Sequence, residues 1–156
     1  MKLILYQPDI PQNAGTLLRL GACLGVAVEV IEPCGFVWDD RRLRRAGMDY
    51  LAGVHLTRHR SWNAYEEVRR ARNERLVLLT TRGEQAYTDF TFAPDDALLL
   101  GRESAGVPDE IHGCANASLR IPLRSGQRSL NVAVAGAMVL GEALRQTTQF
   151  PQEENP

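Results

Sequence analysis

The chain has 156 residues, of which 44% are hydrophobic and 24% charged, and this length and composition suit a single globular domain over residues 1–156. Its 3 cysteines stand apart, with no CxxC pair and no clustered histidines, which argues against a zinc site or a disulfide framework and for a reducing compartment. The N-terminal apolar run is too short for a signal peptide, and the longest apolar stretch, 132–141, is too short to cross a bilayer. We therefore expect a cytoplasmic protein with no metal and no membrane partner.

Apolar runs alternate with helix-like segments along the chain. The apolar runs predict strands over 3–6, 28–31, 54–57, 76–79, 97–100 and 119–121. Helical spacing of apolar residues predicts helices over 13–24, 39–46, 62–73 and 130–146. Several strands are apolar on consecutive residues, which indicates burial on both faces and a parallel sheet flanked by helices. The pattern therefore predicts an α/β doubly wound fold, followed by a polar, flexible tail over 147–156.

The net charge of −1 conceals a segregation of charge along the chain. Residues 41–75 contain ten arginines and four acidic residues, a local charge of +6. Of the 18 basic residues, 17 are arginine, whose planar fork suits contacts with phosphate. This segment is therefore either a surface for a nucleic acid or an ordinary solvated helix face, and composition alone does not separate the two.

In doubly wound sheets, ligands bind beyond the carboxyl ends of the strands, and three loops there are rich in special residues. The first loop, 7–15, contains two prolines that fix the exit from the strand, followed by Asn13, which can cap the next helix. Arg19 lies among Leu17, Leu18 and Leu20 on a largely apolar helix, where a charge needs a partner. Capping accounts for Asn13 without any function, whereas it does not account for Arg19.

The second loop follows the apolar strand at 97–100 and carries Gly101, Glu103, Gly106 and Pro108. Two glycines and a proline describe a tight turn that exposes backbone N–H and C=O groups, and such groups can bind an adenine edge without any side chain. The loop is not a Walker loop, since no Gly-Lys-Ser or Gly-Lys-Thr follows, and it is not a GxGxxG fingerprint. Turns of this composition are also common in proteins without a nucleotide ligand.

The third loop covers 121–131 and precedes a long helix of small and apolar residues. Ser129 is a candidate N-cap for that helix. Asn131 is the only polar residue near the start of the helix, and a buried asparagine needs hydrogen-bond partners. Two interpretations stay open: simple capping of the helix, or a pair of side chains that holds the loop against a ligand.

In this order, the three loops resemble the three motifs of the SPOUT superfamily of RNA methyltransferases, in the branch that methylates ribose 2′-hydroxyls. The matching positions are Asn13 and Arg19, then Gly101, Glu103, Gly106 and Pro108, and finally Ile121, Pro122 and 129–131. A further stretch, 32–50, resembles the small bacterial members that modify the wobble nucleotide of certain leucine tRNAs. The likeness spans nearly the whole chain.

The resemblance implies an α/β fold with a C-terminal trefoil knot, and a homodimer that uses S-adenosylmethionine and no metal to methylate the wobble pyrimidine in a tRNA anticodon loop. By position, the cofactor would contact Leu79, Thr80, Gly101, Glu103, Ile121, Pro122, Ser129 and Leu130. The catalytic residues would be Arg19, Asn13, Glu103 and Asn131. Arg19 would orient the ribose hydroxyl rather than act as a base, because a guanidinium stays protonated at ordinary pH. The tRNA phosphates would be bound by Arg41, Arg42, Arg44 and Arg45.

Two positions depart from the family pattern: Arg102 stands where relatives usually have proline or a small residue, and Gly141 where a tyrosine is common. The alternatives are methylation of another RNA site, methylation of a base, a non-catalytic RNA-binding module of the same fold, and an unrelated nucleotide-binding enzyme. Methylation of a guanine ring nitrogen would favour an acidic general base in the third loop, which has no acidic residue. The presence of Arg19, Asn13 and Asn131 disfavours the non-catalytic module, and the lack of a phosphate loop disfavours the unrelated enzyme.

Overall fold

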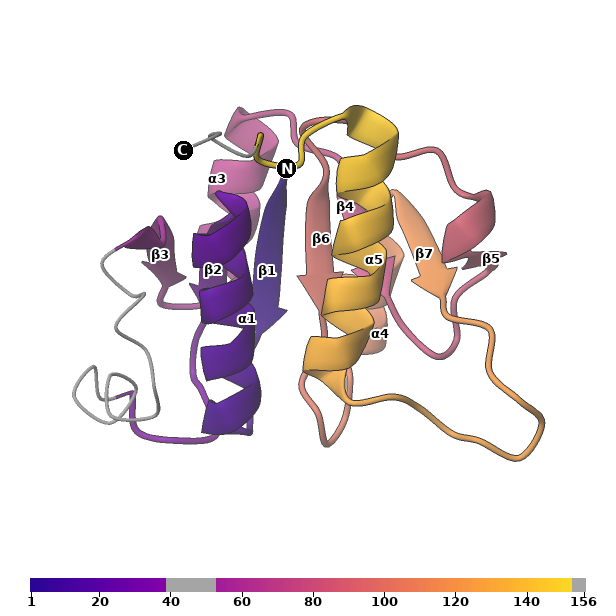
Figure 1. The fold of residues 1–156 in the computed structure, drawn as a ribbon. Coiled ribbons are helices and arrows are strands. Elements are labelled where there is room, and N and C mark those ends of the chain that lie inside the picture. Colours follow the sequence, from indigo (N-terminus) through magenta and orange to yellow (C-terminus); the bar gives the residue numbers. More distant parts are fainter. Residues whose placement is uncertain (39–52, 153–156) are drawn as a thin grey trace.

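The computed structural model describes residues 1–38 and 53–152. Its centre is a seven-stranded sheet in the order β3-β2-β1-β6-β4-β7-β5, in which neighbouring strands are parallel (Figure 1). The strands are β1 (Lys2–Tyr6), β2 (Ala27–Ile31), β3 (Leu56–His59), β4 (Leu76–Leu79), β5 (Gln85–Ala86), β6 (Ala97–Leu100) and β7 (Ala117–Arg120). Among the described residues, the helices are α1 (Pro11–Leu24), α3 (Trp62–Ala71), α4 (Asp109–Cys114), α5 (Val132–Thr147) and the short 3₁₀ helix η2 (Tyr87–Asp89). The predicted α/β fold with a parallel sheet is confirmed.

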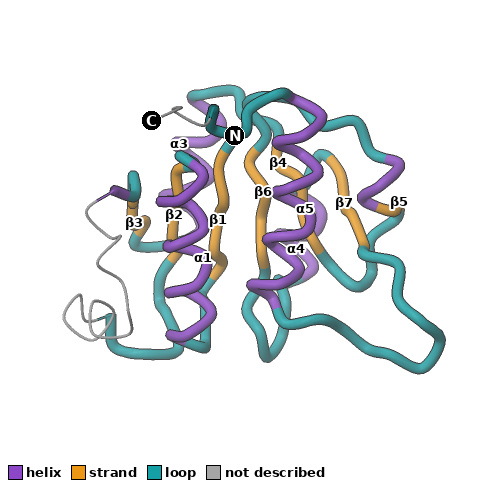
Figure 2. The backbone as a smooth tube through the Cα atoms, in the orientation of Figure 1, coloured by secondary structure: helices purple, strands orange, loops and turns teal. Residues whose placement is uncertain are grey.

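Helices cover both faces of the sheet, with α1 and α5 on one face and α3 and α4 on the other (Figures 1 and 2). Leu3 and Leu5 of β1 belong to the core beneath α1 and α5, whereas Ile4 and Tyr6 belong to the core beneath α3 and α4. All of these side chains are buried. Burial on both faces is the reason that the central strands are apolar on consecutive residues.

The helix ends follow local chemistry. Helix α1 begins at Pro11, whose fixed φ suits the first turn. It ends at Leu24, and the following Gly25 has a φ of 66° and donates its N–H to the carbonyl oxygen of Gly21. Helix α3 begins after Ser61, whose side chain accepts from the backbone N–H of Ala64.

Some elements differ from the sequence prediction. Helix α1 begins at Pro11, ahead of the predicted 13–24, because the proline starts the helix. The third strand is displaced from 54–57 to Leu56–His59, where it pairs with β2. The sequence prediction lacks β5, η2 and α4, since each is too short to show a periodic apolar pattern. The helix predicted over 39–46 lies outside the described residues.

The strand order places a change of direction between β1 and β6. From β1 the chain runs outward through β2 to β3 and returns across the sheet to β4, and β6 then fills the position between β1 and β4. Ligand sites in parallel α/β sheets lie at such a switch point, beyond the carboxyl ends of the strands. The loops that leave β1 and β6 are the first two of the three loops singled out in the sequence.

Candidate functional site

Side-chain hydrogen bonds join the three predicted loops. Glu103, in the loop after β6, accepts from Asn13 Nδ2 at 2.9 Å through one carboxylate oxygen and from the backbone N–H of Asp9 at 2.7 Å through the other. Asn13 in turn accepts at Oδ1 from Asn131 Nδ2 at 2.9 Å. We call Glu103, Asn13 and Asn131 the amide cluster. It brings three of the four predicted catalytic residues together at the carboxyl edge of the sheet.

Asn131 closes the amide cluster and also caps helix α5. Its side-chain oxygen accepts from the backbone N–H groups of Ala133 at 2.8 Å and Val134 at 3.3 Å, which satisfies two donors that a helix start otherwise leaves without partners. The capping interpretation of Asn131 is confirmed, but the asparagine is exposed rather than buried. The capping predicted for Ser129 is wrong, because the helix begins at Val132 and Asn131 occupies the cap position.

Asn13 does not cap helix α1. The cap position belongs to Ile10, which makes no side-chain hydrogen bond there. Asn13 lies inside the first turn, buried with 8% exposure, and both ends of its amide bond to other loops. Asparagine is disfavoured inside a helix, so the contacts with Glu103 and Asn131 account for its place.

Arg19 lies on the exposed side of helix α1. Its sequence neighbours Leu17 and Leu18 are buried against the sheet, whereas Arg19 is exposed. An α-helix has about 3.6 residues per turn, so the positions adjacent to the buried Leu17 and Leu18 face a different environment. Arg19 therefore lies at the surface of helix α1.

An ion pair that the sequence analysis missed lies beside the amide cluster. Arg102 donates to Asp9 Oδ1 from Nη2 at 2.5 Å and from Nε at 3.2 Å. Ser104 donates to Asp9 Oδ2 from its backbone N–H at 3.1 Å and from its hydroxyl. The hydrogen bonds from Arg102 and Ser104 lower the pKa of Asp9 to about 2, and Asp9 raises the pKa of Arg102. The signal in the sequence was Arg102 itself, which departs from the family pattern.

The residues predicted to contact a cofactor begin at the ends of three neighbouring strands. Leu79 of β4 pairs with Leu100 of β6 on one side and with Leu119 of β7 on the other. Thr80 extends this alignment by donating its backbone N–H to the carbonyl oxygen of Leu119 at 2.9 Å. Gly101 directly follows Leu100, so the loops leave β4, β6 and β7 at one edge of the sheet and at one level.

The remaining predicted cofactor residues lie in the loop between β7 and α5, which extends away from the sheet (Figure 1). Ile121 is half-buried, whereas Pro122, Ser129 and Leu130 are exposed. Asn131 at the end of this loop is bonded to Asn13, so Leu130 is held next to the amide cluster. An exposed loop without regular structure leaves backbone N–H and C=O groups for a ligand.

Three further expectations concern metal, membrane and RNA. In the ranges 1–38 and 53–152, no group of three or more His, Cys, Asp or Glu side chains is placed to hold a metal ion. No helix of the described part of the chain is long and apolar enough to cross a membrane. The arginines predicted to bind tRNA, Arg41, Arg42, Arg44 and Arg45, lie outside the described residues.

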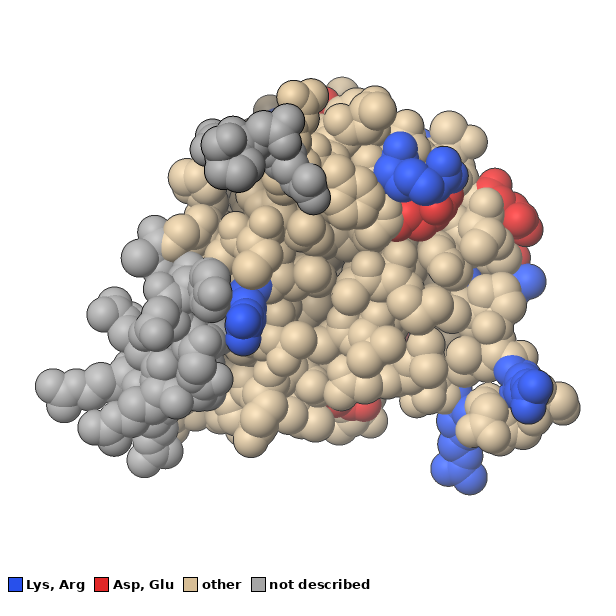
Figure 3. Space-filling view, in the orientation of Figure 1, with Lys and Arg blue, Asp and Glu red and all other residues tan. Residues whose placement is uncertain are grey.

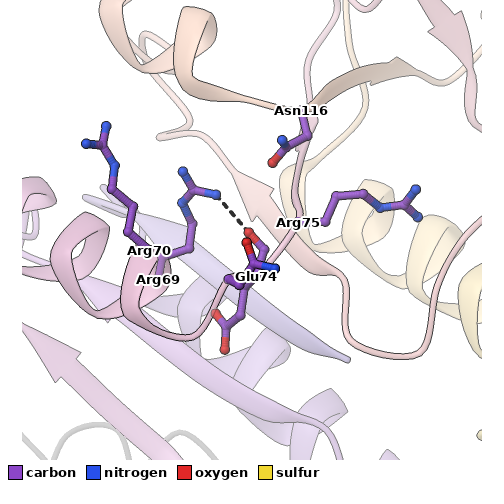
Figure 4. Close-up of a pocket in the computed structure, with 6 residues that line it drawn as sticks. Arg69, Arg70, Glu74, Arg75 and Asn116 are labelled. Carbon is purple, nitrogen blue, oxygen red and sulfur yellow. Dashed lines mark hydrogen bonds between the residues drawn. The ribbon is translucent and has the colours of Figure 1, made fainter.

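A cavity of about 410 Å³ lies at the opposite, amino-terminal edge of the sheet, lined by Arg69, Arg70, Asn73, Glu74, Arg75 and Asn116 (Figure 4). Its guanidinium groups are already paired. Arg69 and Arg70 bond to Glu66, and Arg75 forms a bidentate pair with Asp96. Because carboxylates neutralise these arginines, the cavity is not a strong anion site, and it contains none of the predicted catalytic, cofactor-binding or tRNA-binding residues.

Comparisons with known proteins agree with the geometry of the three loops. Residues 1–141 match the model of the SpoU rRNA Methylase family. A relative from Beijerinckia indica, tRNA (cytidine(34)-2'-O)-methyltransferase, is 64% identical over 144 residues, which cover 92% of this chain and 90% of the relative. The relative of the same name from Escherichia coli is 40% identical over 148 residues, which cover 94% of this chain and 93% of the relative.

Solved structures share the fold as well. One, described as structural insights into the 2-OH methylation of C/U34 on tRNA, has a TM-score of 0.87 at 41% identity and covers 93% of this chain and 94% of its own. The SpoU methyltransferase AviRb from Streptomyces viridochromogenes, in complex with the cofactor AdoMet, has a TM-score of 0.85 at 26% identity, with 94% of this chain and 57% of that one covered. The resemblance predicted from the three loops is confirmed, and this chain belongs to the SpoU rRNA methylase family.

Proposed function

We propose that this protein transfers a methyl group from S-adenosylmethionine to the ribose 2′-hydroxyl of the wobble nucleotide, cytidine 34, of a tRNA. The observation that carries the proposal is the amide cluster, which gathers the three loops of the SPOUT pattern at the carboxyl edge of the sheet. The relatives named tRNA (cytidine(34)-2'-O)-methyltransferase support the choice of substrate. Leucine tRNAs are the isoacceptors that the resemblance of residues 32–50 favours.

The loops at this edge suit S-adenosylmethionine. A Cβ at Gly101 would lie 2.7 Å from the carbonyl carbon of Gly106, so only glycine allows the loop to close this tightly. Arg102 and Gly106 exchange backbone hydrogen bonds of 3.1 and 2.8 Å across the closed loop, which holds its outer backbone groups in place for an adenine edge. Leu79, Ile121 and Leu130 would offer apolar contacts, with Thr80, Pro122 and Ser129 beside them. When bound, the cofactor supplies a methyl group on a positively charged sulfur that is already activated for displacement.

The protein's own residues then have to align the ribose and favour loss of its hydroxyl proton. Both oxygens of Glu103 and both ends of the Asn13 amide are engaged within the fold, so these side chains hold the loops in place. We assign the role of orienting the ribose to Arg19. Its protonated guanidinium would orient the 2′-hydroxyl and stabilise the negative charge that develops on the oxygen.

The RNA site would include Arg19, and the charges of Arg41, Arg42, Arg44 and Arg45 suit phosphates. An anticodon loop is single-stranded, so its riboses are accessible without melting a duplex. A variant that lacks one of these arginines would neutralise one phosphate fewer. Its slope of log binding constant against log salt concentration for tRNA should therefore be smaller by about one unit.

We infer that the protein acts as a homodimer through the face that carries α1 and α5. Figure 3 shows this face, and most of its charged side chains lie toward the periphery. Exposed apolar side chains on or beside these helices include Ile10 (41% exposed), Val134 (50%) and Met138 (39%). Exposed apolar surface of this kind favours a protein–protein contact, and a two-fold axis would pair the two helices with those of a second copy.

We also infer a trefoil knot in the C-terminal part of the chain. Strand β7 lies between β4 and β5, so the 80–84 connection has to cross the carboxyl end of β7. Backbone hydrogen bonds hold this crossing, from Thr80 to Leu119 at 2.9 Å and from Glu84 to Ser118 at 3.0 Å. A Cβ at Gly83 would lie 2.2 Å from the carbonyl carbon of Leu119, so glycine is needed here. The segment that leaves β7 would thread beneath the connection before it reaches α5.

The experiment that tests the proposed function uses the purified protein, cofactor with a labelled methyl group, and unmodified leucine tRNA. Nuclease digestion then locates the label. We expect label on the ribose of nucleotide 34, none with Arg19→Ala, and none on a tRNA whose nucleotide 34 already carries the 2′-O-methyl group. Label on a base, or only on ribosomal RNA, would refute the substrate and leave the fold and the cofactor site standing.

A further inference from the structure

Asp9 and Arg102 are not among the catalytic or cofactor-binding residues assigned above. Their ion pair nevertheless joins two loops of the site. The Asp9 carboxylate is held by Arg102 on one oxygen and by Ser104 on the other. Glu103, between these two residues, accepts from the backbone N–H of Asp9 at 2.7 Å. The bonds therefore run in both directions between the loop after β1 and the loop after β6. We call these four residues the Asp9 clasp.

A third segment closes around the same carboxylate. Gly35, in the stretch that follows β2, donates its backbone N–H to the carbonyl oxygen of Pro8 at 2.9 Å. A Cβ at Gly35 would lie 2.7 Å from Asp9 Oδ1, so the two segments are in close contact. The Asp9 side chain keeps 18% of its surface exposed and the Arg102 side chain 33%. Because the segments that follow β1, β2 and β6 meet at Asp9, this carboxylate has little freedom to move.

We propose that Asp9 and Arg102 are positioning residues of the methyl-transfer site, an inference that rests on the proposed function. Their ion pair, in which Nε and Nη2 of Arg102 both donate to Asp9 Oδ1, sets the position of the loop after β1 relative to the loop after β6. Gly101, adjacent to Arg102, is thereby placed for the cofactor. Asn13 is placed for the amide cluster, because Glu103 bonds both to the Asp9 backbone and to the Asn13 amide.

The pair requires the fork of an arginine. Nε and Nη2 both bond to Asp9, a planar geometry that the single ammonium group of lysine does not reproduce. Arg102→Lys therefore keeps the charge and removes the geometry. If the clasp positions the loop, Arg102→Lys should resemble Arg102→Ala. If Arg102 acts only through its charge, the lysine variant should resemble the wild type.

The first measurement is the affinity of the apo protein for S-adenosylhomocysteine by calorimetry. We expect Arg102→Lys and Asp9→Asn each to weaken binding by about tenfold. The double variant should be little weaker than either single variant, since both changes remove one shared interaction. The matched control is Arg75→Lys, which breaks an arginine–aspartate pair made through the same two donors, Nε and Nη2, to Asp96 at 2.6 and 2.7 Å, at the far edge of the sheet. It should lower the melting temperature and leave the affinity within about twofold.

The second measurement, amide hydrogen exchange in the apo protein, needs neither cofactor nor RNA. The N–H groups of Asp9 and Ser104 donate to partners across the clasp, so both should exchange faster in Arg102→Lys and at the wild-type rate in Arg75→Lys. The inference is overturned if Arg102→Lys is folded, binds S-adenosylhomocysteine as the wild type does and shows unchanged exchange. If the wild type binds no S-adenosylhomocysteine, the proposed function fails, and the exchange rates alone then decide whether the clasp orders the two loops.

Discussion

Asn131 donates from Nδ2 to Oδ1 of Asn13 at 2.9 Å, although 118 positions separate the two residues. The other end of each amide is also bonded, since Asn13 Nδ2 donates to Glu103 and Asn131 Oδ1 caps helix α5. The two asparagines therefore fix each other's orientation. They tie the start of α1 to the start of α5, next to the loops proposed to hold the cofactor, so a change to either amide should affect both helices.

Arg19→Ala should abolish methyl transfer and leave the affinity for S-adenosylhomocysteine nearly unchanged, because Arg19 is assigned to the ribose and not to the cofactor. We expect a loss of more than about tenfold in the single-turnover rate, or ~1.4 kcal/mol. Arg70→Ala removes another arginine with an exposed side chain, at the other edge of the sheet, and should keep the full rate. An Arg19→Ala protein that retains more than about a tenth of the rate would contradict the assignment.

Two substitutions of Asn131 separate its role as a cap from its role in the amide cluster. Serine caps a helix about as well as asparagine, whereas alanine does not, so Asn131→Ala should be less stable than Asn131→Ser by about 1 kcal/mol. Neither residue has the side-chain amide N–H that donates to Asn13, so both variants should lose methyl transfer to a similar extent. Denaturant unfolding and single-turnover assays measure the two effects. Full activity in Asn131→Ser would show that the bond to Asn13 is dispensable.

Val134→Lys and Met138→Lys should each convert the protein to a monomer, because they place a charge on the apolar surface of α5 that we assign to the dimer contact. Light scattering at working concentrations measures the mass directly. Asn63→Lys adds the same charge on the exposed surface of α3, on the opposite face, and should remain dimeric. A monomeric wild type, or lysine variants that stay dimeric, would show that this dimer contact is assigned wrongly.

The Asp9 clasp should contribute to stability in a pH-dependent way. Its hydrogen bonds to Arg102 and Ser104 lower the pKa of Asp9 from 3.8 to about 2. Because the pKa of the Asp9 carboxyl is lower in the folded protein, its ionised form stabilises the fold at pH values above 3.8. That stabilisation is lost as the pH falls through the window between 3.8 and about 2. The difference in unfolding free energy between wild type and Asp9→Asn should therefore shrink as the pH falls through that window. Urea unfolding across it tests the sign, and a constant difference would mean that Asp9 carries no such linkage.

Local sequence pattern by itself determined the layers of this fold. Strands such as β1 and β6 are apolar on consecutive residues because side chains on both faces are buried, and that alone predicts a parallel sheet between two layers of helices. The three functional loops were also found locally. Glycine, proline and asparagine at a strand exit are also typical of ordinary turns and caps, but doubly wound sheets place such exits at one edge, where ligands bind.

Only the tertiary structure decided what the polar residues in those loops do. Asn13 was a candidate cap by its sequence position, but Pro11 starts the helix earlier and leaves Asn13 to bond with Glu103 and Asn131. The clasp between Asp9 and Arg102 is equally invisible to periodicity. Each of these contacts joins residues at least 90 positions apart. Two of them form because β6, which comes late in the sequence, lies next to β1 in the sheet. Strand order is set by the burial of whole faces, which no local window of sequence contains.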